Sequence, residues 1–223
     1  MKAVIFDLDG TLVDSALDIQ ASANAMLHAI DLPPLSYDLI CSFIGNGIPK
    51  LVERVMAASQ VAFTPETHSQ LTEVFTAHYT KNPADKTVVY PGVLALLDHL
   101  KSKGIALGVC TNKNHSLAVQ VLDGLNIADY FASVIGGDSL PMRKPDPEPF
   151  FECARQLTAQ DAVYIGDSEV DAATAQAAKV PFGLFTEGYR NTSVEFIPHS
   201  FAFSDFSTLA SHLDAIFQTE TAA

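Results

Sequence analysis

Basic residues are scarce in this chain of 223 residues. It contains 13 Lys and Arg against 26 Asp and Glu, which gives a formal net charge of −13. A nucleic-acid backbone would be repelled by that charge, so a DNA- or RNA-binding role is not expected. An anionic small molecule could bind only where positive charge is concentrated locally, by a metal ion, a few Lys or Arg side chains, or helix N-termini.

Long hydrophobic runs and paired cysteines are also missing. No apolar run approaches the ~20 residues of a membrane span, and Lys2 is followed by only four apolar residues before Asp7. The sequence therefore predicts a cytoplasmic protein without a signal peptide or a membrane partner. The three cysteines, Cys41, Cys110 and Cys153, form no CxxC pair, so neither a zinc ribbon nor a disulfide framework is indicated.

The apolar content is high enough for a substantial core. Hydrophobic residues make up 48% of the chain and charged residues only 17%, which excludes disorder for most of it. Short apolar runs alternate with amphipathic helical patterns, as in a parallel sheet covered by helices. The predicted fold is α/β, a doubly wound parallel sheet with a Rossmann-like core. Its predicted strands are residues 3–6, 105–110, 133–135, 162–165, 182–185 and 201–203, and its predicted helices are residues 92–103, 115–125, 147–156, 168–179 and 207–217.

The stretch between the first strand and Val88 breaks this alternation, with several helix signals and no convincing strand. Asp14 or Ser15 can cap a helix that runs to about residue 30, before two prolines. Thr64 is an N-cap candidate, because proline follows it at the first helical position. We therefore expect an all-helical cap domain at residues 15–84, a core domain at residues 1–14 and 85–223, and fraying over residues 218–223.

Two aspartates come directly after the first predicted strand, in the sequence Asp7-Leu8-Asp9-Gly10-Thr11-Leu12. In an open parallel sheet, ligands bind at the carboxyl ends of the strands. A calcium loop of the EF-hand type would need alternating acids before its glycine, whereas Gly10 follows the second acid directly. Unpaired carboxylates clustered at a strand end are costly without a cation, so the pattern favours a metal site over a turn cap.

A second acidic segment, Gly166-Asp167-Ser168-Glu169-Val170-Asp171, follows the strand predicted at residues 162–165 and opens an Ala-rich helix. Asp167 is therefore expected at the same sheet edge as Asp7. Asp171 lies about one helical turn later and faces the same way. Capping of the helix is the alternative role for Asp167 and Ser168. The recurrence of acids at a second strand end favours a metal ligand.

Two further segments could bind an anion. Thr111-Asn112-Lys113 ends the strand predicted at residues 105–110 and precedes a helix, so a hydroxyl and backbone N–H groups meet at a helix N-terminus. In Arg143-Lys144-Pro145-Asp146-Pro147, the prolines rigidify the loop that holds Lys144 just ahead of a predicted helix. A solvated surface charge is the alternative for Lys144.

Together the four segments resemble the haloacid dehalogenase superfamily, in its phosphatase branch with a helical cap inserted after the first motif. The motifs occur in order along the whole chain, as DLDGTL at residues 7–12, Thr111 at a strand end, Lys144 before a proline, and GDSxxD at residues 166–171. The segments FIGNGIPKLVER at residues 43–54, TNK at 111–113 and RKPDPEP at 143–149 are most similar to phosphoglycolate phosphatases. One departure is Lys179, where the family usually has glycine after the fourth-motif helix, and it bears on helix termination.

The resemblance implies Mg²⁺-dependent hydrolysis of a small phosphomonoester through an aspartyl-phosphate. Asp7 would attack phosphorus, while Asp9 would protonate the leaving alcohol and then deprotonate the hydrolytic water. Mg²⁺ would be held by Asp7, the Asp9 backbone carbonyl, Asp167 and waters. The other implied roles are phosphoryl binding by Thr111 and Lys144, and orientation of ligands, water or Lys144 by Ser168 and Asp171.

The segment Gly45-Asn46-Gly47 and the helix after it are expected to read the non-phosphate end of the substrate. Apolar residues at helical spacing, namely Ile48, Leu51, Val52 and Val55, should pack into the cap and leave Lys50 and Arg54 together on another face. Two cations there could meet a carboxylate, whereas local pairing of Lys50 with Glu53 is the alternative. The substrate-binding candidates are Thr11, Gly45, Asn46, Gly47, Lys50, Arg54, Thr111, Asn112 and Lys144.

Several activities remain open at this point. Hydrolysis of 2-phosphoglycolate to glycolate and phosphate is the first expectation, and the alternatives are N-acetylmuramic acid 6-phosphate or another sugar phosphate, pyrophosphate, and a phosphosugar mutase reaction. A dehalogenase has no use for Asp9, and a non-enzymatic phospho-ligand sensor should lack a motif residue. The sequence contains no HExxH or GxSxG, so a metalloprotease or serine hydrolase is not supported. The expected partner is a small phosphorylated metabolite, bound by a monomer or a homodimer.

Overall fold

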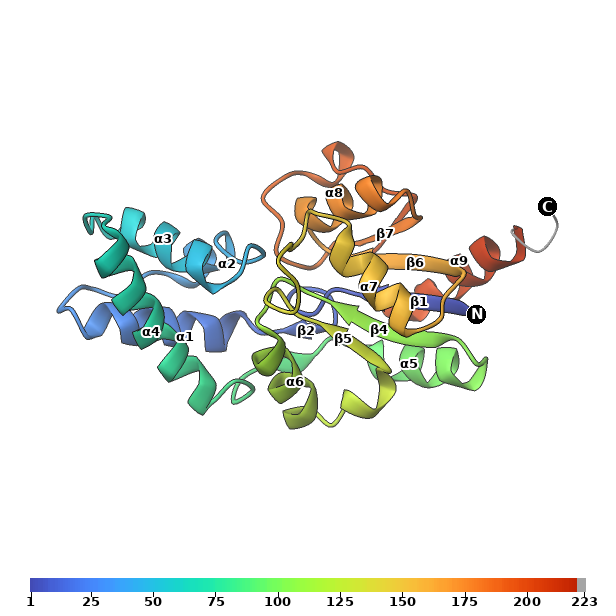
Figure 1. Ribbon diagram of the computed structural model, residues 1–223, viewed down its shortest axis with the longest axis horizontal. Helices are drawn as coiled ribbons and strands as arrows, with labels where there is room; N and C mark the ends of the chain where they lie inside the picture. Colours follow the sequence, from blue (N-terminus) through green and yellow to red (C-terminus); the bar gives the residue numbers. More distant parts are fainter. Residues whose placement is uncertain (220–223) are drawn as a thin grey trace.

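A six-stranded parallel sheet forms the centre of the molecule in the computed structural model, which describes residues 1–219 (Figure 1). The strand order is β5-β4-β1-β6-β7-β8, and every neighbouring pair is parallel. This arrangement confirms the predicted α/β fold. The strands are β1 (Lys2–Phe6), β4 (Ala106–Cys110), β5 (Ser133–Ile135), β6 (Asp161–Gly166), β7 (Phe182–Phe185) and β8 (Phe201–Phe203).

Helices cover both faces of this sheet. Successive side chains of a strand point to opposite faces, so Val4 and Phe6 of β1 belong to one apolar layer, and Ala3 and Ile5 to the other. The first layer is completed by α5 (Val93–Ser102), α6 (His115–Gly124) and α9 (Phe206–Thr219). The second is completed by α7 (Glu148–Gln156) and α8 (Glu169–Ala178). The sheet is therefore doubly wound, and its carboxyl edge is left open.

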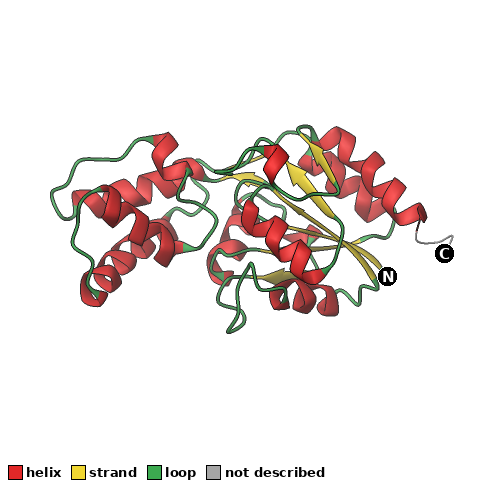
Figure 2. Cartoon of the chain, turned by 90° about the horizontal axis from the view of Figure 1, so that it is seen from above, coloured by secondary structure: helices red, strands yellow, loops and turns green. Residues whose placement is uncertain are grey.

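Four helices lie between β1 and α5 in the sequence and pack together beside the carboxyl edge of the sheet (Figure 2). They are α1 (Ala16–His28), α2 (Tyr37–Cys41), α3 (Ile48–Ala58) and α4 (Pro65–Lys81), and we refer to them as the cap. The cap has an apolar core of its own. The α3 side chains expected to pack there, Ile48, Leu51, Val52 and Val55, are buried.

Two short strands join the cap to the sheet domain. Strand β2 (Val13–Asp14) pairs with β3 (Val88–Val89) in antiparallel fashion. The expectation that no strand occurs before Val88 is therefore wrong. A strand of two residues is too short to show an alternating pattern, which explains why the sequence did not reveal β2.

The helix ends show which capping expectations are met. Thr64 caps α4, since its Oγ1 accepts a hydrogen bond from the Thr67 N–H at 3.1 Å. Lys179 ends α8 in the left-handed conformation, with φ of 58°, where glycine would be under less strain. The expected fraying of the tail falls partly on residues 220–223, which lie outside the described residues. None of the helices in the described part of the chain is both long and apolar enough to cross a bilayer.

Candidate active site

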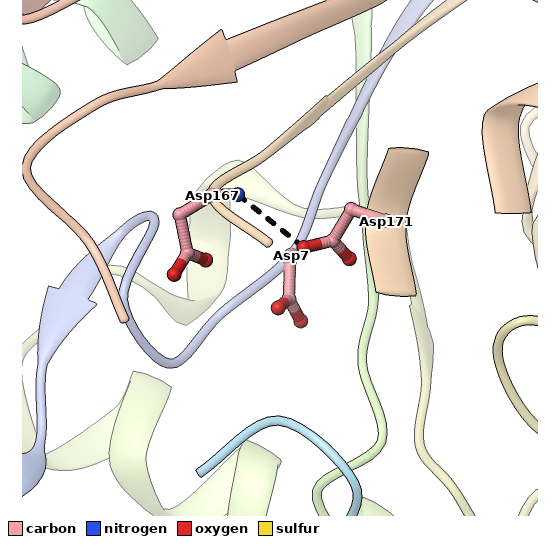
Figure 3. A group of neighbouring side chains, drawn as sticks. All are labelled: Asp7, Asp167 and Asp171. Carbon is pink, nitrogen blue, oxygen red and sulfur yellow. Dashed lines mark hydrogen bonds between the residues drawn. The ribbon is translucent and has the colours of Figure 1, made fainter. Parts of the chain in front are cut away.

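Asp7 and Asp167 lie side by side at the carboxyl edge of the sheet, because β1 and β6 are neighbours that end in register. Phe6 pairs with Ile165, and the Asp7 N–H donates to the Ile165 carbonyl at 2.8 Å. Asp171, in the first turn of α8, completes the group, and carboxylate oxygens of the three residues lie within 4.8 Å of one another (Figure 3). All three side chains are buried, so the structure gathers three acids in a space that bulk water does not reach.

Burial and mutual repulsion make this group difficult to ionise. Burial raises the pKa of Asp7 to about 6, although Lys144 acts against this rise. Burial and the charges of Asp171 and Asp7 hold the pKa of Asp167 well above its usual range. Burial also opposes ionisation of Asp171, but the adjacent Lys144 ammonium and three hydrogen bonds hold its pKa below the usual range. A cation that bound here would relieve the repulsion.

The oxygen atoms of this group fit a hard divalent ion. Asp7 Oδ1 is buried and accepts no hydrogen bond, although Lys144 Nζ lies 3.0 Å away. Asp167 is fixed by the Thr11 hydroxyl at 2.7 Å and by the Tyr189 N–H at 2.6 Å. Carboxylate oxygens are the ligands that Mg²⁺ prefers, and an oxygen that accepts no hydrogen bond, beside two further acids, is suited to such an ion.

Gly10 lets the first motif turn closely around Asp167. Its φ is +86°, and a Cβ there would lie 2.4 Å from Asp167 Oδ2. A side chain at this position would therefore displace a candidate metal ligand.

Lys144 is the buried cation at the centre of the site, not a solvated surface charge. Its Nζ lies 2.6 Å from Asp171 Oδ1 and donates to the Tyr164 hydroxyl at 2.8 Å. Although burial opposes its charge, Asp171 and Asp7 raise the pKa of Lys144 above its usual value, so the side chain remains protonated. Thr111, which follows β4, is buried at the same edge. The structure thus brings Lys144 and Thr111 to the aspartates, as the motif order predicts.

Ser168 supports Asp171 from the start of α8. Its hydroxyl donates to Asp171 Oδ2 at 2.7 Å and its N–H to the same oxygen at 3.1 Å. The two residues form a capping box, so they cap the N-terminus of α8 and at the same time hold Asp171 beside Lys144.

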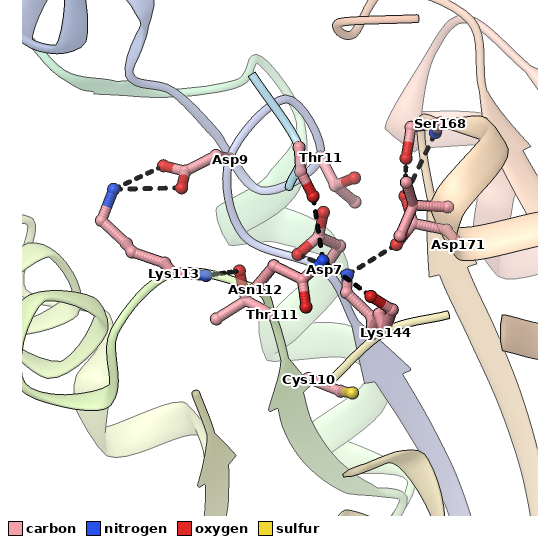
Figure 4. A network of polar contacts seen from close by, with 12 residues as sticks. Asp7, Asp9, Thr11, Cys110, Thr111, Asn112, Lys113, Lys144, Ser168 and Asp171 are labelled. Atoms are coloured by element: carbon pink, nitrogen blue, oxygen red, sulfur yellow. Dashed lines mark hydrogen bonds and ion pairs between the residues drawn. The ribbon is translucent and has the colours of Figure 1, made fainter. Parts of the chain in front are cut away.

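Asp9 faces away from the three clustered acids and toward a second lysine (Figure 4). Lys113 Nζ lies 2.8 and 3.0 Å from the two Asp9 oxygens, and the Ser15 hydroxyl donates to Oδ1 at 2.6 Å. Lys113 also donates to the Tyr79 hydroxyl, on helix α4 of the cap. Burial opposes its charge, yet Asp9 raises the pKa of Lys113 above its usual value.

Sequence reasoning did not assign site roles to several of these residues. Lys113 carried one signal, since it stands two positions after the strand-end Thr111. Ser15 is only six positions from Asp9 but was expected as a helix cap, and Tyr164 lies within a strand and gave no signal. Tyr79 and Tyr189 come from elements farther along the chain and also gave none.

A small cavity of about 40 Å³ lies between the cap and the sheet domain. On the side of the sheet domain, both Asp7 and Asp9 line this cavity. The cap contributes mainly apolar side chains and two glycine positions. The lining residues are Asp7, Asp9, Thr111, Asn112 and Lys113 from the sheet domain, and Ile19, Ile44, Gly45, Gly47, Ile48, Leu51, Phe75 and Tyr79 from the cap.

The cap loop before α3 touches the site through its glycines. Asn112 Nδ2 donates to the Gly45 carbonyl at 3.0 Å and to the Lys144 carbonyl at 3.1 Å. Gly47 has φ of +80°, and a Cβ there would lie 3.1 Å from the Asn112 carbonyl oxygen. Asn112 therefore connects the cap loop to the loop that holds Lys144.

Three other candidates on this part of the cap do not line the cavity. Lys50 pairs with Glu53 at 2.7 Å on the exposed face of α3. Arg54 donates to the Phe43 carbonyl and to Asn46 Oδ1, both at 2.8 Å. The expectation that Lys50 and Arg54 lie together facing a substrate needs correction, because local partners occupy both cations and the Asn46 side chain.

Thr11 also differs from its expected place. Its side chain is completely buried and its hydroxyl donates to Asp167 instead of lining the cavity. The reason is the tight turn at Gly10, which directs the residue after it toward β6. Thr11 therefore positions a candidate metal ligand and does not contact the space available to a substrate.

Comparisons with known proteins agree with this geometry. The chain is 46% identical over 209 residues to a phosphoglycolate phosphatase of Cereibacter sphaeroides, covering 94% of this chain and 96% of the relative. It is 41% identical to a phosphoglycolate phosphatase of Rhodospirillum rubrum, with coverages of 95% and 90%. The crystal structure of a predicted phosphoglycolate phosphatase from Haemophilus somnus superposes with a TM-score of 0.90 at 30% identity, covering 96% of this chain and 98% of the other. The pattern of the haloacid dehalogenase-like hydrolases matches residues 4–185, and the chain belongs to this family.

Proposed function

We propose that this protein is a phosphatase that hydrolyses 2-phosphoglycolate to glycolate and phosphate with the help of Mg²⁺. The observation that carries the proposal is the placement of Asp7 and Asp9. Asp7 lies among buried acids beside Lys144, whereas Asp9 lies at the cavity that faces the cap. This arrangement supports attack on phosphorus by Asp7 and proton transfer to the leaving group by Asp9.

The first step transfers the phosphoryl group to the protein. An Asp7 carboxylate oxygen forms a bond to phosphorus as the bond from phosphorus to the alcohol oxygen breaks. Asp9 gives its proton to that departing oxygen. Lys144, with Thr111 nearby, is placed to stabilise the phosphoryl oxygens during transfer. The products are free glycolate and an aspartyl-phosphate at Asp7.

The second step regenerates the protein. Asp9, now ionised, takes a proton from a water molecule, whose oxygen attacks phosphorus and breaks the bond to Asp7. When bound to Asp7, Asp167 and the Asp9 backbone carbonyl, Mg²⁺ would offset the negative charge of the phosphoryl group and keep Asp7 ionised. Phosphate then leaves, and both aspartates return to their starting states.

The similar proteins support 2-phosphoglycolate as the substrate. Relatives from Cereibacter sphaeroides and Rhodospirillum rubrum carry the name phosphoglycolate phosphatase. We therefore place 2-phosphoglycolate ahead of N-acetylmuramic acid 6-phosphate, pyrophosphate and a mutase substrate.

The experiment is a phosphate-release assay on the purified chain, with Mg²⁺ and after treatment with EDTA. The substrates are 2-phosphoglycolate, N-acetylmuramic acid 6-phosphate, pyrophosphate and β-glucose 1-phosphate. We expect the highest kcat/KM for 2-phosphoglycolate and loss of turnover in EDTA. Conversion of β-glucose 1-phosphate into an isomeric phosphate without release would instead identify a mutase.

Asp7→Asn should abolish turnover while leaving the fold intact. The amide is isosteric with the carboxylate but cannot form the aspartyl-phosphate, and it removes one charge from a crowded buried group. Circular dichroism should match the unaltered protein, and phosphate release should fall to that of a blank without enzyme. Steady-state turnover above the blank would show that Asp7 is not the nucleophile.

A further inference from the structure

The two buried lysines of the site lie at opposite ends, Lys144 beside the clustered acids and Lys113 beside Asp9 and the cap. Lys144 lies between Asp7 and Asp171, with its Nζ 3.0 and 2.6 Å from their oxygens. Lys113 lies toward the cap, between Asp9 and the Tyr79 hydroxyl. Only 3% of the Lys113 side chain is exposed, so it is not a surface charge that found a partner by chance. The second lysine therefore lies at the end of the site away from Lys144, where one of its two contacts with Asp9 can be exchanged for a part of the substrate other than its phosphoryl group.

Lys113 is also the single cationic side chain among the described residues that line the cavity. The cap side of the cavity is formed mainly by Ile19, Ile44, Ile48, Leu51 and Phe75, and Tyr79 is the one polar cap side chain among the described residues that line it. A carboxylate that enters loses its hydration, and it is stabilised only where a cation or hydrogen-bond donors replace that water. Lys113 is the cation that a carboxylate in this cavity would meet.

The chemistry of the substrate brings its carboxylate to this lysine. In 2-phosphoglycolate a single CH₂ group separates the bridging oxygen from the carboxylate carbon. Asp9 must reach the bridging oxygen to protonate it, and Lys113 Nζ lies 2.8 Å from Asp9 Oδ1. A carboxylate so near the bridging oxygen therefore lies within reach of the same ammonium group.

We propose that Lys113, held in place by the Tyr79 hydroxyl, pairs with the substrate's carboxylate and selects carboxylated phosphomonoesters. This inference rests on the proposed function and adds to it the residue that reads the glycolate part. Tyr79 belongs to α4, and its hydroxyl bonds Lys113 across the cavity. The cap thus supplies the hydroxyl that orients the lysine. Lys113, a residue of the sheet domain, thus takes the carboxylate-binding role that the sequence led us to expect of Lys50 and Arg54.

The test compares two alkyl phosphates that differ by the carboxylate, 2-phosphoglycolate and 2-hydroxyethyl phosphate. The variant is Lys113→Met, which keeps the length of the side chain and removes its charge. The matched control is Lys103→Met, because Lys103 pairs with Asp214 at 2.8 Å on the far surface. A loss of support for Asp9 lowers kcat/KM for both substrates alike. The ratio of the two kcat/KM values isolates recognition of the carboxylate.

We expect Lys113→Met to reduce the preference for 2-phosphoglycolate by about tenfold or more, the usual worth of one hydrogen bond to a charged group. Lys103→Met should leave the preference unchanged. Equal losses on both substrates would overturn the role of Lys113 and leave the proposed function standing. No release of phosphate from 2-phosphoglycolate by the unaltered protein would overturn the proposed function itself.

A second variant keeps the test decisive if Lys113→Met does not fold. Lys113→Gln removes the charge but retains a donor for Asp9 and for the Tyr79 hydroxyl. Circular dichroism selects the variant to be assayed, and the expected fall in preference is the same. A preference that Lys113→Gln retains in full would likewise overturn the inference.

Discussion

Asp7 and Asp9 are two positions apart yet have different surroundings. Asp7 lies with two buried acids and Lys144, whereas Asp9 bonds Lys113 and Ser15. The backbone turns directly after Asp9, at Gly10, whose φ of +86° directs the chain back over the sheet edge. A short turn therefore gives two identical side chains different partners, which is the arrangement that separate roles in one reaction require.

Asp9→Asn should reduce turnover of substrates with poor leaving groups more than turnover of substrates with good ones. An alkyl alcohol needs a proton as it departs, whereas p-nitrophenolate leaves without one. We expect kcat for 2-phosphoglycolate to fall about a hundredfold or more, within the usual range for general acid catalysis, and kcat for p-nitrophenyl phosphate to fall much less. The control is Asp98→Asn, since Asp98 is exposed and accepts a hydrogen bond from the Tyr130 hydroxyl at 2.6 Å, away from the acids of the site. Equal losses on both substrates would leave Asp9 with a structural role alone.

Residues that directly follow a strand could be predicted from the sequence, and residues that reach the site from elsewhere could not. Asp7 and Thr111 stand one position after a predicted strand and Asp167 stands two positions after one, so topology alone places them at one edge. Tyr79 is a cap residue whose partner Lys113 lies 34 positions away. Ser15 has the position of a helix N-cap, but its hydroxyl bonds Asp9 instead. Local pattern carries no information about such contacts.

At the scale of elements, the loop after β7 links the sheet domain to the start of the cap through hydrogen bonds of Tyr189. Tyr189 in this loop donates its N–H to Asp167 Oδ2 at 2.6 Å. Its hydroxyl oxygen accepts from the N–H groups of Ser15 and Ala16 at 2.8 and 3.0 Å, and it also bonds Asp14. The phenol thus caps helix α1, which leaves the Ser15 hydroxyl free to bond Asp9.

Tyr189→Phe should therefore destabilise the protein. It removes the acceptor of two N–H groups at the start of α1 and keeps the backbone bond to Asp167. We expect the free energy of unfolding to fall by about 1 kcal/mol, the usual worth of a helix cap, in urea denaturation. Tyr130→Phe is the matched control, because the Tyr130 hydroxyl donates to Asp98 at 2.6 Å in an exposed position and not to the start of a helix. An equal effect of both substitutions would show that Tyr189 does not cap α1.

Elements with a full period of sequence pattern could be predicted, and the shortest could not. The strands Ser133–Ile135, Phe182–Phe185 and Phe201–Phe203 have the bounds that the apolar runs predict. The helices of the sheet domain agree to within about two residues, as is usual for helix ends. β2 and β3 have two residues each and pair with each other although the cap helices separate them in the sequence, so neither shows an alternating hydrophobic pattern.

At the scale of the whole molecule, a net charge of −13 coexists with a site for an anionic substrate. Lys113 and Lys144 are both buried at the site, opposite Asp9 and Asp171. The two lysines bring positive charge to the site, but Asp7 and Asp167 have no lysine besides the shared Lys144. A metal ion would add the further positive charge that these buried acids call for.

The effect of metal on stability should depend on pH. Burial raises the pKa of Asp7 to about 6 and holds that of Asp167 well above its usual range in the metal-free protein. Because the folded state then binds more protons than the unfolded state, Asp7 lowers the stability of the metal-free fold as pH rises through about 4 to 6, and Asp167 acts in the same sense up to its own raised pKa. Asp171, whose pKa is lowered, acts in the opposite sense. The rise in Tm produced by Mg²⁺, rather than Tm itself, is therefore the quantity to measure.

Mg²⁺ binds the ionised carboxylates and must compete with protons at low pH. We expect saturating Mg²⁺ to raise Tm by several degrees at about pH 7.5 and by much less at about pH 5, relative to EDTA. Asp167→Asn should remove most of the rise, because it deletes one ligand of the buried group. The exposed Asp98→Asn should keep the rise. A rise of equal size at both pH values, or one that persists in Asp167→Asn, would place the metal away from these carboxylates.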